Sequence, residues 1–495
     1  MIELPAGWEV SRLADIAEVR LGRQRSPKNA TGDRMRPYLR AANVKWTGLD
    51  LSDLNEMAFT EAEAETYELR RGDLLLGEAS GSPSEVGKPG QYKGEVDGCC
   101  FQNTLLRVRL PDGLLPDFYE YYFREQAFNG KFAAGSRGVG IHHLGAAALS
   151  NWRVPVPPQT EQMRIVTAIE EAFSKLDAGE AGLRTVRQLV KRMREAVLAA
   201  AVTGRLVRVS GDIASDDATL ESLREASIAL MRAGRRRRGT TAADIPVPGV
   251  DLPPSWRWVR WSQVGHCQNG RAFPSDHYQN DGVPLLRPGN LAANGRVRWT
   301  AANTRYLPEH YAQSAADLLV APSEVVMNLT AQSLKDDFLG RACITGPVER
   351  CLLNQRLARL TPFATSSAYA LLFFRSPLFR DFVKTLNTGS LIQHMYTHQL
   401  DSCWIPLPPK SDQDTVVAEC ERSLSVVDNL ERTVDAAALR GAGLRRSVLK
   451  AAFEGQLVEQ DPSEHPASSV LQRIQADRTS GVGLSGGRRK KAETS

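Results

Sequence analysis

The amino-acid sequence presents the same series of motifs twice, and the two copies are offset by about 250 residues along the chain. Leu4-Pro-Ala-Gly-Trp8 returns as Leu252-Pro-Pro-Ser-Trp256, and the proline-rich stretch that starts at Trp152 returns at Cys403. Solenoid repeats are about 20 to 50 residues long, so a repeat of this length makes each copy a module with its own core. The duplication predicts two diverged modules that recognise two different things with one geometry.

The composition is that of an ordinary globular protein, with 42% hydrophobic and 24% charged residues among 495. No apolar run approaches the roughly 20 residues that a membrane span needs, and the first residues lack the basic and apolar regions of a signal peptide. The seven cysteines form no C-x-x-C motif and have no zinc-like spacing to histidine, which is typical of a reducing compartment. We therefore expect a cytoplasmic chain that has no membrane contact and no bound metal.

The first part of each copy, residues 4–158 and 252–409, has mixed α/β character with many short strands between Gly, Pro and Asn turns. The strand-like runs include Arg71–Gly77, Leu105–Leu110 and Cys343–Thr345, and the helical runs include Asp117–Gln126 and its counterpart near Tyr369–Val383.

The second part of each copy has the spacing of a long helix. The prolines of Val154–Pro158 exclude a helix there, and Thr160 is an N-cap candidate. Apolar residues then recur every three or four positions, with a break expected at Gly179 and Gly182, until Gly204 ends the helix. The second copy starts near Asp412 and is expected to be interrupted at Gly441 and Gly443. Two such helices predict an antiparallel pair, and the alternative is that each helix docks only on its own module.

The predicted fold class is α+β, with two tandem mixed α/β recognition domains separated by two long helices that pair as an antiparallel coiled coil. The predicted domains are recognition domain 1 (1–158), spacer helix region 1 (159–207), a linker with a short helix and a basic run (208–250), recognition domain 2 (251–409), spacer helix region 2 (410–458) and a C-terminal short helix with a basic tail (459–495). The short helices are expected at Thr219–Arg232 and Ser468–Arg478, and the basic runs at 234–239 and 486–491 are either solvated tails or phosphate contacts.

No catalytic motif is present. The sequence has no methyltransferase Asn-Pro-Pro-Tyr or Asp-Pro-Pro-Tyr motif, no dinucleotide loop, no nucleophile elbow and no H-E-x-x-H motif. His142, His143, His394 and His398 could ligate a metal, but without a third ligand in register they are better interpreted as polar loop residues. The chain is therefore predicted to recognise rather than to catalyse, with no catalytic residue.

Charge is unevenly distributed in the first module. Residues 20–45 hold eight basic residues and one acid, Asp33, whereas residues 50–68 hold seven acids and no base. A basic flank with interspersed Asn and Gln is typical of a surface that contacts phosphates and base edges. The predicted DNA-binding residues are Arg23, Arg25, Lys28, Arg40, Asn43, Lys45, Arg137, His142, Arg271, Arg287, Asn290, Arg298, Asn387, Gln393 and His394.

Four of these residues form two Arg–Asn pairs that have a second interpretation. Arg40 with Asn43, and Arg287 with Asn290, occupy the same place in both copies, so they either face DNA or tie a turn. Trp46 and Trp299 close the matching segments and are better interpreted as packing residues than as base-stacking platforms.

In its ordered double set of motifs the chain resembles the specificity subunit of type I restriction–modification enzymes. The resemblance covers nearly the whole length and rests on the L-P-x-x-W openings at Leu4 and Leu252, the R-x-x-N segments at Arg40 and Arg287, the P-x-P-P-x-x-E/D-Q junctions at Pro155 and Pro406, and the helix ends V-x-G-x-L-V at Val202 and F-E-G-Q-L-V at Phe453. It implies two target-recognition domains, each of which reads one half of a bipartite, asymmetric double-stranded DNA site.

The resemblance also implies partners and cofactors. The helices would set the spacer and bind two methyltransferase (modification) subunits, and a restriction (translocase) subunit would join the complex. S-adenosylmethionine, ATP and Mg would be used by those partners, and this chain itself would bind none. The predicted partner-binding residues are Ile165, Ile169, Phe173, Val190, Met193, Val197, Leu424, Val427, Leu444 and Val448.

Two alternatives remain open at this stage. One is a specificity subunit of another methylation-based phage-defence system, and the other is an adaptor whose duplicated modules bind proteins rather than DNA.

Overall fold

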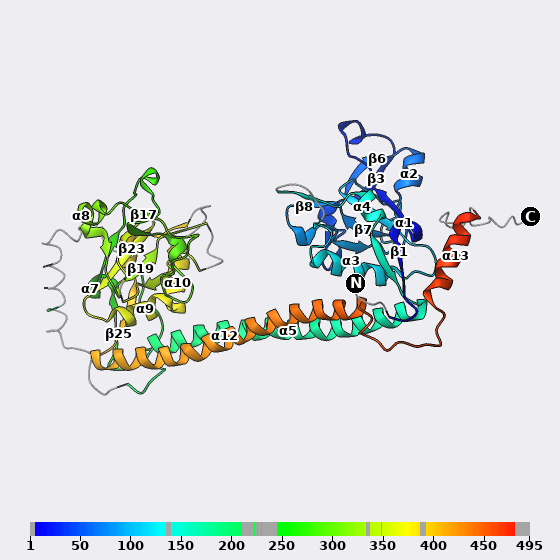
Figure 1. Ribbon diagram of the computed structural model, residues 1–495. Coiled ribbons are helices and arrows are strands. Elements are labelled where there is room, and N and C mark those ends of the chain that lie inside the picture. Colours follow the sequence, from blue (N-terminus) through cyan, green and yellow to red (C-terminus); the bar gives the residue numbers. More distant parts are fainter. Residues whose placement is uncertain are drawn as a thin grey trace, which may run out of the picture. The chain divides into compact units, whose positions relative to one another are not determined.

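The computed structural model describes residues 5–134, 140–209, 245–332, 337–347, 349–386 and 393–480, together with residues 222, 225 and 229. The chain folds into two compact units: unit 1 consists of Met1–Leu183 and Ala436–Ser495, and unit 2 consists of Arg184–Asp435. Unit 1 therefore combines the two ends of the chain, as the blue and red ribbons of Figure 1 show. We call residues 5–158 module 1 and residues 252–409 module 2.

Module 1 is built on a four-stranded antiparallel sheet in the order β2-β11-β7-β9. The side chains of β7 alternate between two cores: Leu74 and Leu76 face one, and Leu75 faces the other. This explains why the strand reads as a continuous apolar run. Around the sheet lie the three-stranded sheet β10-β3-β6 and the pairs β1–β13, β12–β8 and β4–β5.

The strands of module 1 are β1 Glu9–Arg12, β2 Glu18–Leu21, β3 Met35–Leu39, β4 Val44–Lys45, β5 Gly48–Leu49, β6 Asn55–Ala58, β7 Leu74–Gly77, β8 Ala79–Ser80, β9 Pro89–Gln91, β10 Cys100–Phe101, β11 Leu105–Arg109, β12 His142–His143 and β13 Arg153–Val156. Its helices are α1 Leu13–Ile16, α2 Glu61–Tyr67, α3 Pro116–Phe128 and α4 Ala146–Ser150, with short 3-10 turns at η1 Pro27–Asn29, η2 Ala41–Asn43 and η3 Pro83–Glu85.

Module 2 repeats this plan. Its central sheet has the order β15-β23-β19-β21, and in β19 Val325 and Met327 face one core while Val326 faces another. A second sheet, β17-β16-β22-β18, and the pairs β14–β25 and β20–β24 complete it. The equivalent strands therefore keep the same order around a common scaffold.

The strands of module 2 are β14 Arg257–Arg260, β15 Gly265–Asn269, β16 Val283–Leu286, β17 Tyr306–Leu307, β18 Leu319–Val320, β19 Val325–Asn328, β20 Thr330–Ala331, β21 Ala342–Ile344, β22 Cys351–Leu353, β23 Leu357–Pro362, β24 Gln393–His394 and β25 Trp404–Leu407. Its helices are α7 Trp261–Val264, α8 His310–Ser314, α9 Ser367–Arg375, α10 Pro377–Leu386 and α11 Thr397–Asp401, with turns η4 Ser275–His277, η5 Pro288–Asn290 and η6 Ala316–Leu318.

Two long helices follow the modules, and each is 44 residues long: α5 Gln159–Val202 and α12 Lys410–Phe453. Both are continuous, so the predicted breaks at Gly179 and Gly182 and at Gly441 and Gly443 were wrong. A glycine inside a helix costs about 1 kcal/mol relative to alanine but does not stop the helix, whereas a glycine in the left-handed conformation is a common helix end. Gly204 and Gly455 take that conformation, with φ of 68° and 69°, and they follow the two helix ends.

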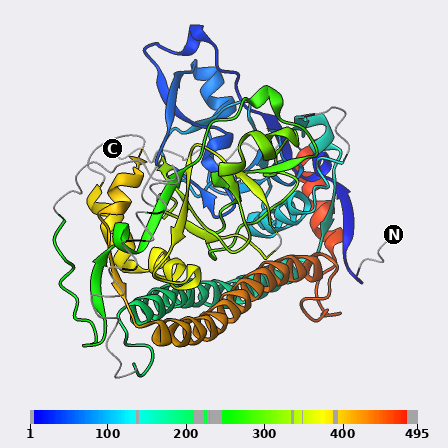
Figure 2. The ribbon, with the colours of Figure 1, turned by 90° about the vertical axis from the view of Figure 1, so that its left-hand side faces the viewer.

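The two helices run antiparallel, which confirms the prediction. In unit 2, Arg187 of α5 pairs with Asp435 of α12 (2.5 Å), and Arg194, two turns further along α5, pairs with Asp428 (2.7 Å). The α12 partner thus moves backwards as α5 advances. Within unit 1 the helices are joined by Arg445, which contacts Asp177 and Glu180, and Figures 1 and 2 both show the pair side by side.

The ends of the helices complete the module cores. In unit 1, Ile165 and Ile169 of α5 and Leu449 of α12 belong to the module 1 core. In unit 2, Leu198 and Val202 of α5 join the module 2 core. The alternative in which each helix docks only on its own module is therefore excluded, because each core contains residues from both long helices.

The remaining predictions have mixed outcomes. The helix expected near Tyr369–Val383 is two helices, α9 and α10, because Pro377 cannot continue α9 and begins α10. The helix expected at Ser468–Arg478 is present as α13 Ala467–Thr479. The basic runs and all but three residues of the predicted helix at 219–232 lie outside the described residues. In the described parts of the chain, no helix is long and apolar enough to cross a membrane.

Candidate DNA interface

Asn43 holds the R-x-x-N turn of module 1 from inside. Its side-chain oxygen accepts the backbone N–H of Arg40 (3.0 Å), and its amide donates to the carbonyls of Asp50 and Asp53 (2.9 Å each). The residue is 3% exposed. Both ends of the amide are therefore used within the chain.

Asn290 does the same in module 2. It accepts the N–H of Arg287 (2.9 Å) and donates to the carbonyls of Arg298 and Asn303 (3.5 Å each), and it is fully buried. The two asparagines are thus the residues that tie the turn. The arginines are the members of each pair with exposed surface, and the turn fixes the backbone from which their side chains project.

The basic and acidic segments of module 1 face each other. Strands β3 and β6 pair antiparallel, and this brings residues 34–40 beside residues 53–68. Four ion pairs join the segments: Arg23–Glu63 (2.8 Å), Arg34–Glu61 (3.0 Å), Arg36–Glu68 (2.9 Å) and Arg40–Asp53 (2.5 Å). The interpretation of the module as one with separate basic and acidic flanks was therefore wrong, because hairpin pairing neutralises much of both.

Some predicted cations stay available. Arg25, Lys28 and Lys45 are exposed, and none of them forms an ion pair with another described residue. In module 2, Arg271 and Arg298 are exposed, and the Arg271 guanidinium lies over the Phe273 ring (5.0 Å). These five residues are exposed cations of the predicted set that a phosphate could reach.

The loop strands β12 and β24 occupy matching places. His142 and His143 pair with β8, and Gln393 and His394 pair with β20. His143 contacts Glu78 (3.2 Å), His394 is exposed, and Gln393 is buried. Arg137 and Asn387 lie outside the described residues.

The two tryptophans are packed. Trp46 stacks on Phe128 (centroids 4.1 Å apart, planes at 14°) and donates to Glu85 (2.6 Å). Trp299 donates to Glu349 (3.1 Å). Both agree with the packing interpretation.

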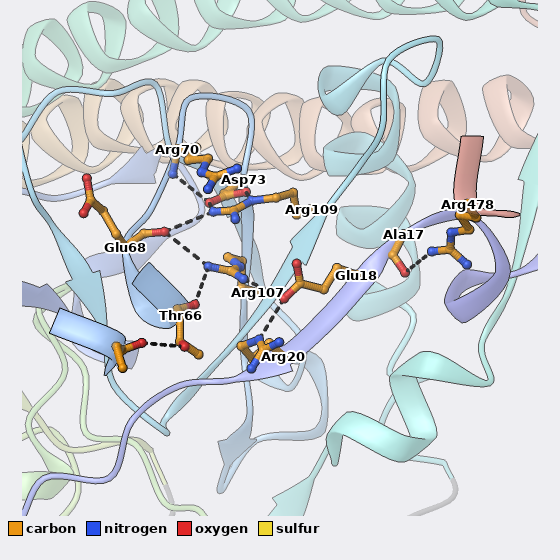
Figure 3. A network of polar contacts seen from close by, with 11 residues as sticks. Ala17, Glu18, Arg20, Thr66, Glu68, Arg70, Asp73, Arg107, Arg109 and Arg478 are labelled. Atoms are coloured by element: carbon orange, nitrogen blue, oxygen red, sulfur yellow. Dashed lines mark hydrogen bonds and ion pairs between the residues drawn. The ribbon is translucent and has the colours of Figure 1, made fainter. Parts of the chain in front are cut away.

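An arginine clamps the loop before each central strand, and the sequence interpretation missed it. Arg107 of β11 is 1% exposed and donates to the carbonyls of Thr66 (3.1 Å) and Glu68 (3.2 Å) and to the Glu18 carboxylate (2.8 Å). Figure 3 shows this network beside the Arg109–Asp73 pair. Burial lowers the pKa of Arg107, but an arginine keeps its charge, so the clamp is permanently ionic.

Arg359 of β23 makes the matching clamp in module 2. It donates to the carbonyls of Leu319 (3.0 Å) and Asp317 (2.8 Å) and pairs with Glu324 (3.3 Å). An arginine between two apolar residues of a strand, as in Leu106-Arg107-Val108 and Ala358-Arg359-Leu360, was the signal that could have revealed both clamps.

The proline junctions fix each module on its helix. Tyr119 donates to the carbonyl of Pro155 (3.3 Å), and Tyr369 donates to that of Pro406 (3.0 Å). Gln162 accepts the N–H of Leu115, which precedes α3, and Gln413 accepts that of Ser366, which precedes α9. The shared Gln of the junction motif thus links the long helix to the same helix of each module.

Comparison with known proteins agrees with this duplicated design. The family model described as "Type I restriction modification DNA specificity domain" matches residues 5–183. The chain is similar to the EcoKI specificity subunit of Escherichia coli K12 (24% identity, 99% of both chains) and to the StySPI specificity subunit of Salmonella potsdam (22% identity, 99% of both chains). A solved structure described under the assembly and conformational transition of a type I R-M system shares the fold, with 19% identity, 92% and 99% coverage and a TM-score of 0.59.

The chain belongs to the specificity subunits of type I restriction–modification systems. As a specificity subunit it recognises DNA and is not the catalytic chain of its system. The resemblance noted in the sequence is thereby confirmed, and the alternative of a protein-binding adaptor falls away.

The helices of this specificity subunit bury most of the residues predicted to bind partners. Ile165, Ile169, Phe173, Val190, Leu424 and Val427 are at most 9% exposed. Such low exposure leaves these side chains almost no surface for another chain to contact. Val197 and Val448 are half-buried, and Met193 and Leu444 are 42% and 53% exposed.

Other large apolar side chains on the helices are exposed, and the sequence interpretation did not single them out. They are Met163, Val186 and Leu189 on α5 and Val426, Leu430 and Leu439 on α12. The described part of the chain contains no group of three or more His, Cys, Asp or Glu side chains that could hold a metal ion.

Proposed function

We propose that this specificity subunit reads a bipartite double-stranded DNA site, with one half of the site recognised by each module. The observation that carries the proposal is the duplicated scaffold with different surfaces. The asparagine turn, the arginine clamp and the junction glutamine recur in both modules, whereas the side chains on their surfaces differ. One geometry with two surfaces is what the recognition of two different half-sites requires.

Exposed cations would position the modules on the phosphate backbone. Arg25, Lys28 and Lys45 in module 1 and Arg271 and Arg298 in module 2 are the predicted residues best placed for this role, because they are exposed. Arg40 and Arg287 project from the asparagine turns, and the Arg40–Asp53 pair would have to open or to be shared with a phosphate. Phosphate contacts orient a protein on DNA, and base contacts specify the sequence.

The paired helices would act as a spacer and as the platform for two methyltransferase subunits. Eight large apolar side chains on the helices are exposed: Met163, Val186, Leu189, Met193, Val426, Leu430, Leu439 and Leu444. Apolar side chains exposed along one pair of helices are typical of a surface that another protein covers. The buried residues among those predicted to bind partners would stabilise the helices that carry this platform.

The chemistry would belong to partner chains in the cytoplasm. Methyl transfer would use S-adenosylmethionine bound by the methyltransferase subunits, and ATP and Mg would serve a translocating restriction subunit. The specificity subunit would determine which DNA sequence is methylated.

The proposal is tested by mapping the DNA positions that the complex methylates. The chain is expressed with its methyltransferase subunits, and methylated positions are mapped across the host genome by single-molecule sequencing. The expected motif has two defined half-sequences separated by a spacer of undefined sequence. Exchange of residues 1–158 for the first module of another specificity subunit should change one half only, and a change in both halves or in neither would contradict the assignment of one half to each module.

A further inference from the structure

The two modules can be compared residue by residue at one surface position. Gly22 and Gly270 each lie against a backbone carbonyl, since an added Cβ would stand 2.2 Å from the Gln102 oxygen and 2.1 Å from the Asn354 oxygen. The next residues, Arg23 and Arg271, form matching parallel bridges with Gln102 and Asn354. The residues before the glycines, Leu21 and Asn269, are therefore equivalent.

The residues that follow strands β12 and β24 give a second alignment between the two modules. The N–H of Leu144 donates to Glu78 (2.7 Å), and that of Met395 donates to Leu329 (2.9 Å). Leu144 and Met395 are both buried, at 1% and 2% exposed. In both modules a five-residue helix, α4 or α11, begins two residues after this position.

This alignment equates Gly145, Ala146 and Ala147 of module 1 with Tyr396, Thr397 and His398 of module 2. At the same place on the common scaffold, module 1 thus presents small or apolar side chains, whereas module 2 presents an aromatic and polar surface.

The module 2 surface is organised. Tyr396 is 59% exposed, and its ring stacks on His398 (centroids 5.4 Å apart, planes at 17°). Asn269 donates to the Thr397 hydroxyl (3.4 Å), which ties β15 to the start of α11. The N–H of Tyr396 donates to Gln399 (2.8 Å), which fixes the backbone that carries the ring.

We propose that Asn269, Tyr396 and His398 form a base-contact patch with which module 2 recognises an A·T pair in its half of the DNA site; this rests on the proposed function. The Asn269 amide has a donor and an acceptor that complement the N7 acceptor and the N6–H donor of adenine in the major groove. An apolar face suits the thymine methyl. Tyr396 supplies that face, and His398 is the positioning residue that supports its ring. Arg271, two residues from Asn269, is exposed and supplies the neighbouring phosphate contact.

A DNA ligand fits this surface better than a protein does. The three side chains of the patch include no carboxylate, and Arg271 and His394, which are close to them in sequence, are exposed. The matched position in module 1 has no polar side chain, so the same base pair cannot be read there. The patch would therefore account for one difference between the two half-sites.

The test combines DNA duplexes in which one group of one base is changed with protein variants in which one side chain is changed. The complex with methyltransferase subunits is titrated with duplexes that carry its own methylated motif, in which each thymine of the module 2 half is replaced in turn by deoxyuridine. At one position, loss of the methyl should weaken wild-type binding about four-fold, the value of one buried methyl group. The Tyr396→Ala complex should bind both duplexes equally, and Tyr396→Phe should behave as wild type.

Adenine is tested with 7-deazaadenine at the paired position. This base should weaken wild-type binding about ten-fold and should have no effect on Asn269→Leu, which carries the module 1 residue. Leu21→Asn, the matched change in module 1, should leave both responses as in wild type.

The outcomes separate the two proposals. Equal sensitivity of wild type and Tyr396→Ala to every uracil, or loss of discrimination in Tyr396→Phe, would overturn the patch while a bipartite motif still supports the proposed function. A wild-type complex that methylates no bipartite motif would instead overturn the proposed function itself.

Discussion

Asparagine side chains hold both arginine turns, and this sets a stability prediction at the scale of single residues. Asn43→Ala and Asn290→Ala each remove three buried hydrogen bonds from a residue that is at most 3% exposed. Leaving buried backbone groups without partners costs about 1 to 3 kcal/mol. Each variant should lower the free energy of unfolding by that amount in urea titrations, with weaker DNA binding as a consequence.

Asn280→Ala is the matched control for the asparagine variants. Asn280 is exposed, and its side chain makes no hydrogen bond with the residues that the structure describes. Its free energy of unfolding should stay within about 0.5 kcal/mol of wild type. Equal stability of Asn43→Ala and Asn280→Ala would contradict the turn role.

The arginine clamp gives a second residue-scale prediction. Arg107→Met keeps most of the side-chain volume but removes the three hydrogen bonds from Arg107 to the carbonyls of Thr66 and Glu68 and to the Glu18 carboxylate. Removing one partner from a buried charged network costs about 3 to 5 kcal/mol. Arg20→Met is the control: Arg20 is 44% exposed and pairs with the same Glu18, and an exposed pair contributes about 1 kcal/mol or less. Similar losses for the two variants in thermal or urea unfolding would refute the clamp.

The residues of the interface were only partly predictable. The repeated motif located both R-x-x-N turns, because both copies keep the same spacing, and the asparagines hold these turns; that Arg40 and Arg287 face DNA stays a prediction. The motif could not show that Arg36 meets Glu68 or that Arg23 meets Glu63. Those ion pairs depend on strand pairing between segments that are 32 to 40 residues apart, and sequence periodicity has no information on that distance.

At the scale of elements, the starts and ends of the long helices could be predicted, but their continuity could not. Proline at Pro158 and left-handed Gly204 are strong local signals, and α5 begins and ends beside them. Gly179 and Gly182 looked like stops, yet the roughly 1 kcal/mol that a glycine costs inside a helix can be offset by contacts with a neighbouring helix. Arg445 of α12 contacts Asp177 and Glu180 on either side of Gly179, and such contacts are tertiary.

The exposed side chains of the helices give a prediction about assembly. Leu189→Asp and Leu439→Asp change side chains that are 54% and 75% exposed, so thermal unfolding of the specificity subunit should be close to wild type. An aspartate within a covered apolar surface loses its hydration, so both variants should bind methyltransferase subunits at least ten-fold more weakly in sedimentation or calorimetry.

The control for that prediction is a buried residue on the same helix. Ile169→Ala should destabilise the chain by about 2 to 5 kcal/mol through a cavity, because Ile169 is fully buried in the module 1 core. Unchanged assembly of both aspartate variants would mean that the partner covers another surface.

At the scale of the whole molecule, the duplication predicted the architecture because it repeats every junction in order. Two modules, two long helices and their antiparallel pairing all follow from that order and from heptad spacing. The completion of each core by both helices did not follow, since Leu449 and Leu198 lie far in sequence from the modules they stabilise. The base pairs that are read depend on exposed side chains and loops, on which a hydrophobic pattern places no constraint.

The helix pair leads to a prediction about DNA spacing. A 44-residue helix is about 66 Å long at 1.5 Å per residue, so helix length would set the distance between half-sites. Because α5 and α12 are paired, an insertion in one helix alone would shift one helix along the other. Four residues are therefore inserted in both, after Ala181 and after Arg440, which lie between the contacts of Arg445 with Glu180 and of Arg187 with Asp435.

The paired insertion lengthens the helix pair by about 6 Å, close to the rise of two base pairs at 3.4 Å each. The methylated motif should gain one or two spacer positions, with both half-sequences unchanged, as read by methylome sequencing of cells that carry the variant complex. The control is the exchange of four exposed residues at the same sites without insertion, which should keep the spacer. A complex that is folded and active with the insertion but keeps the original spacer would falsify the role of the helices in setting the spacer length.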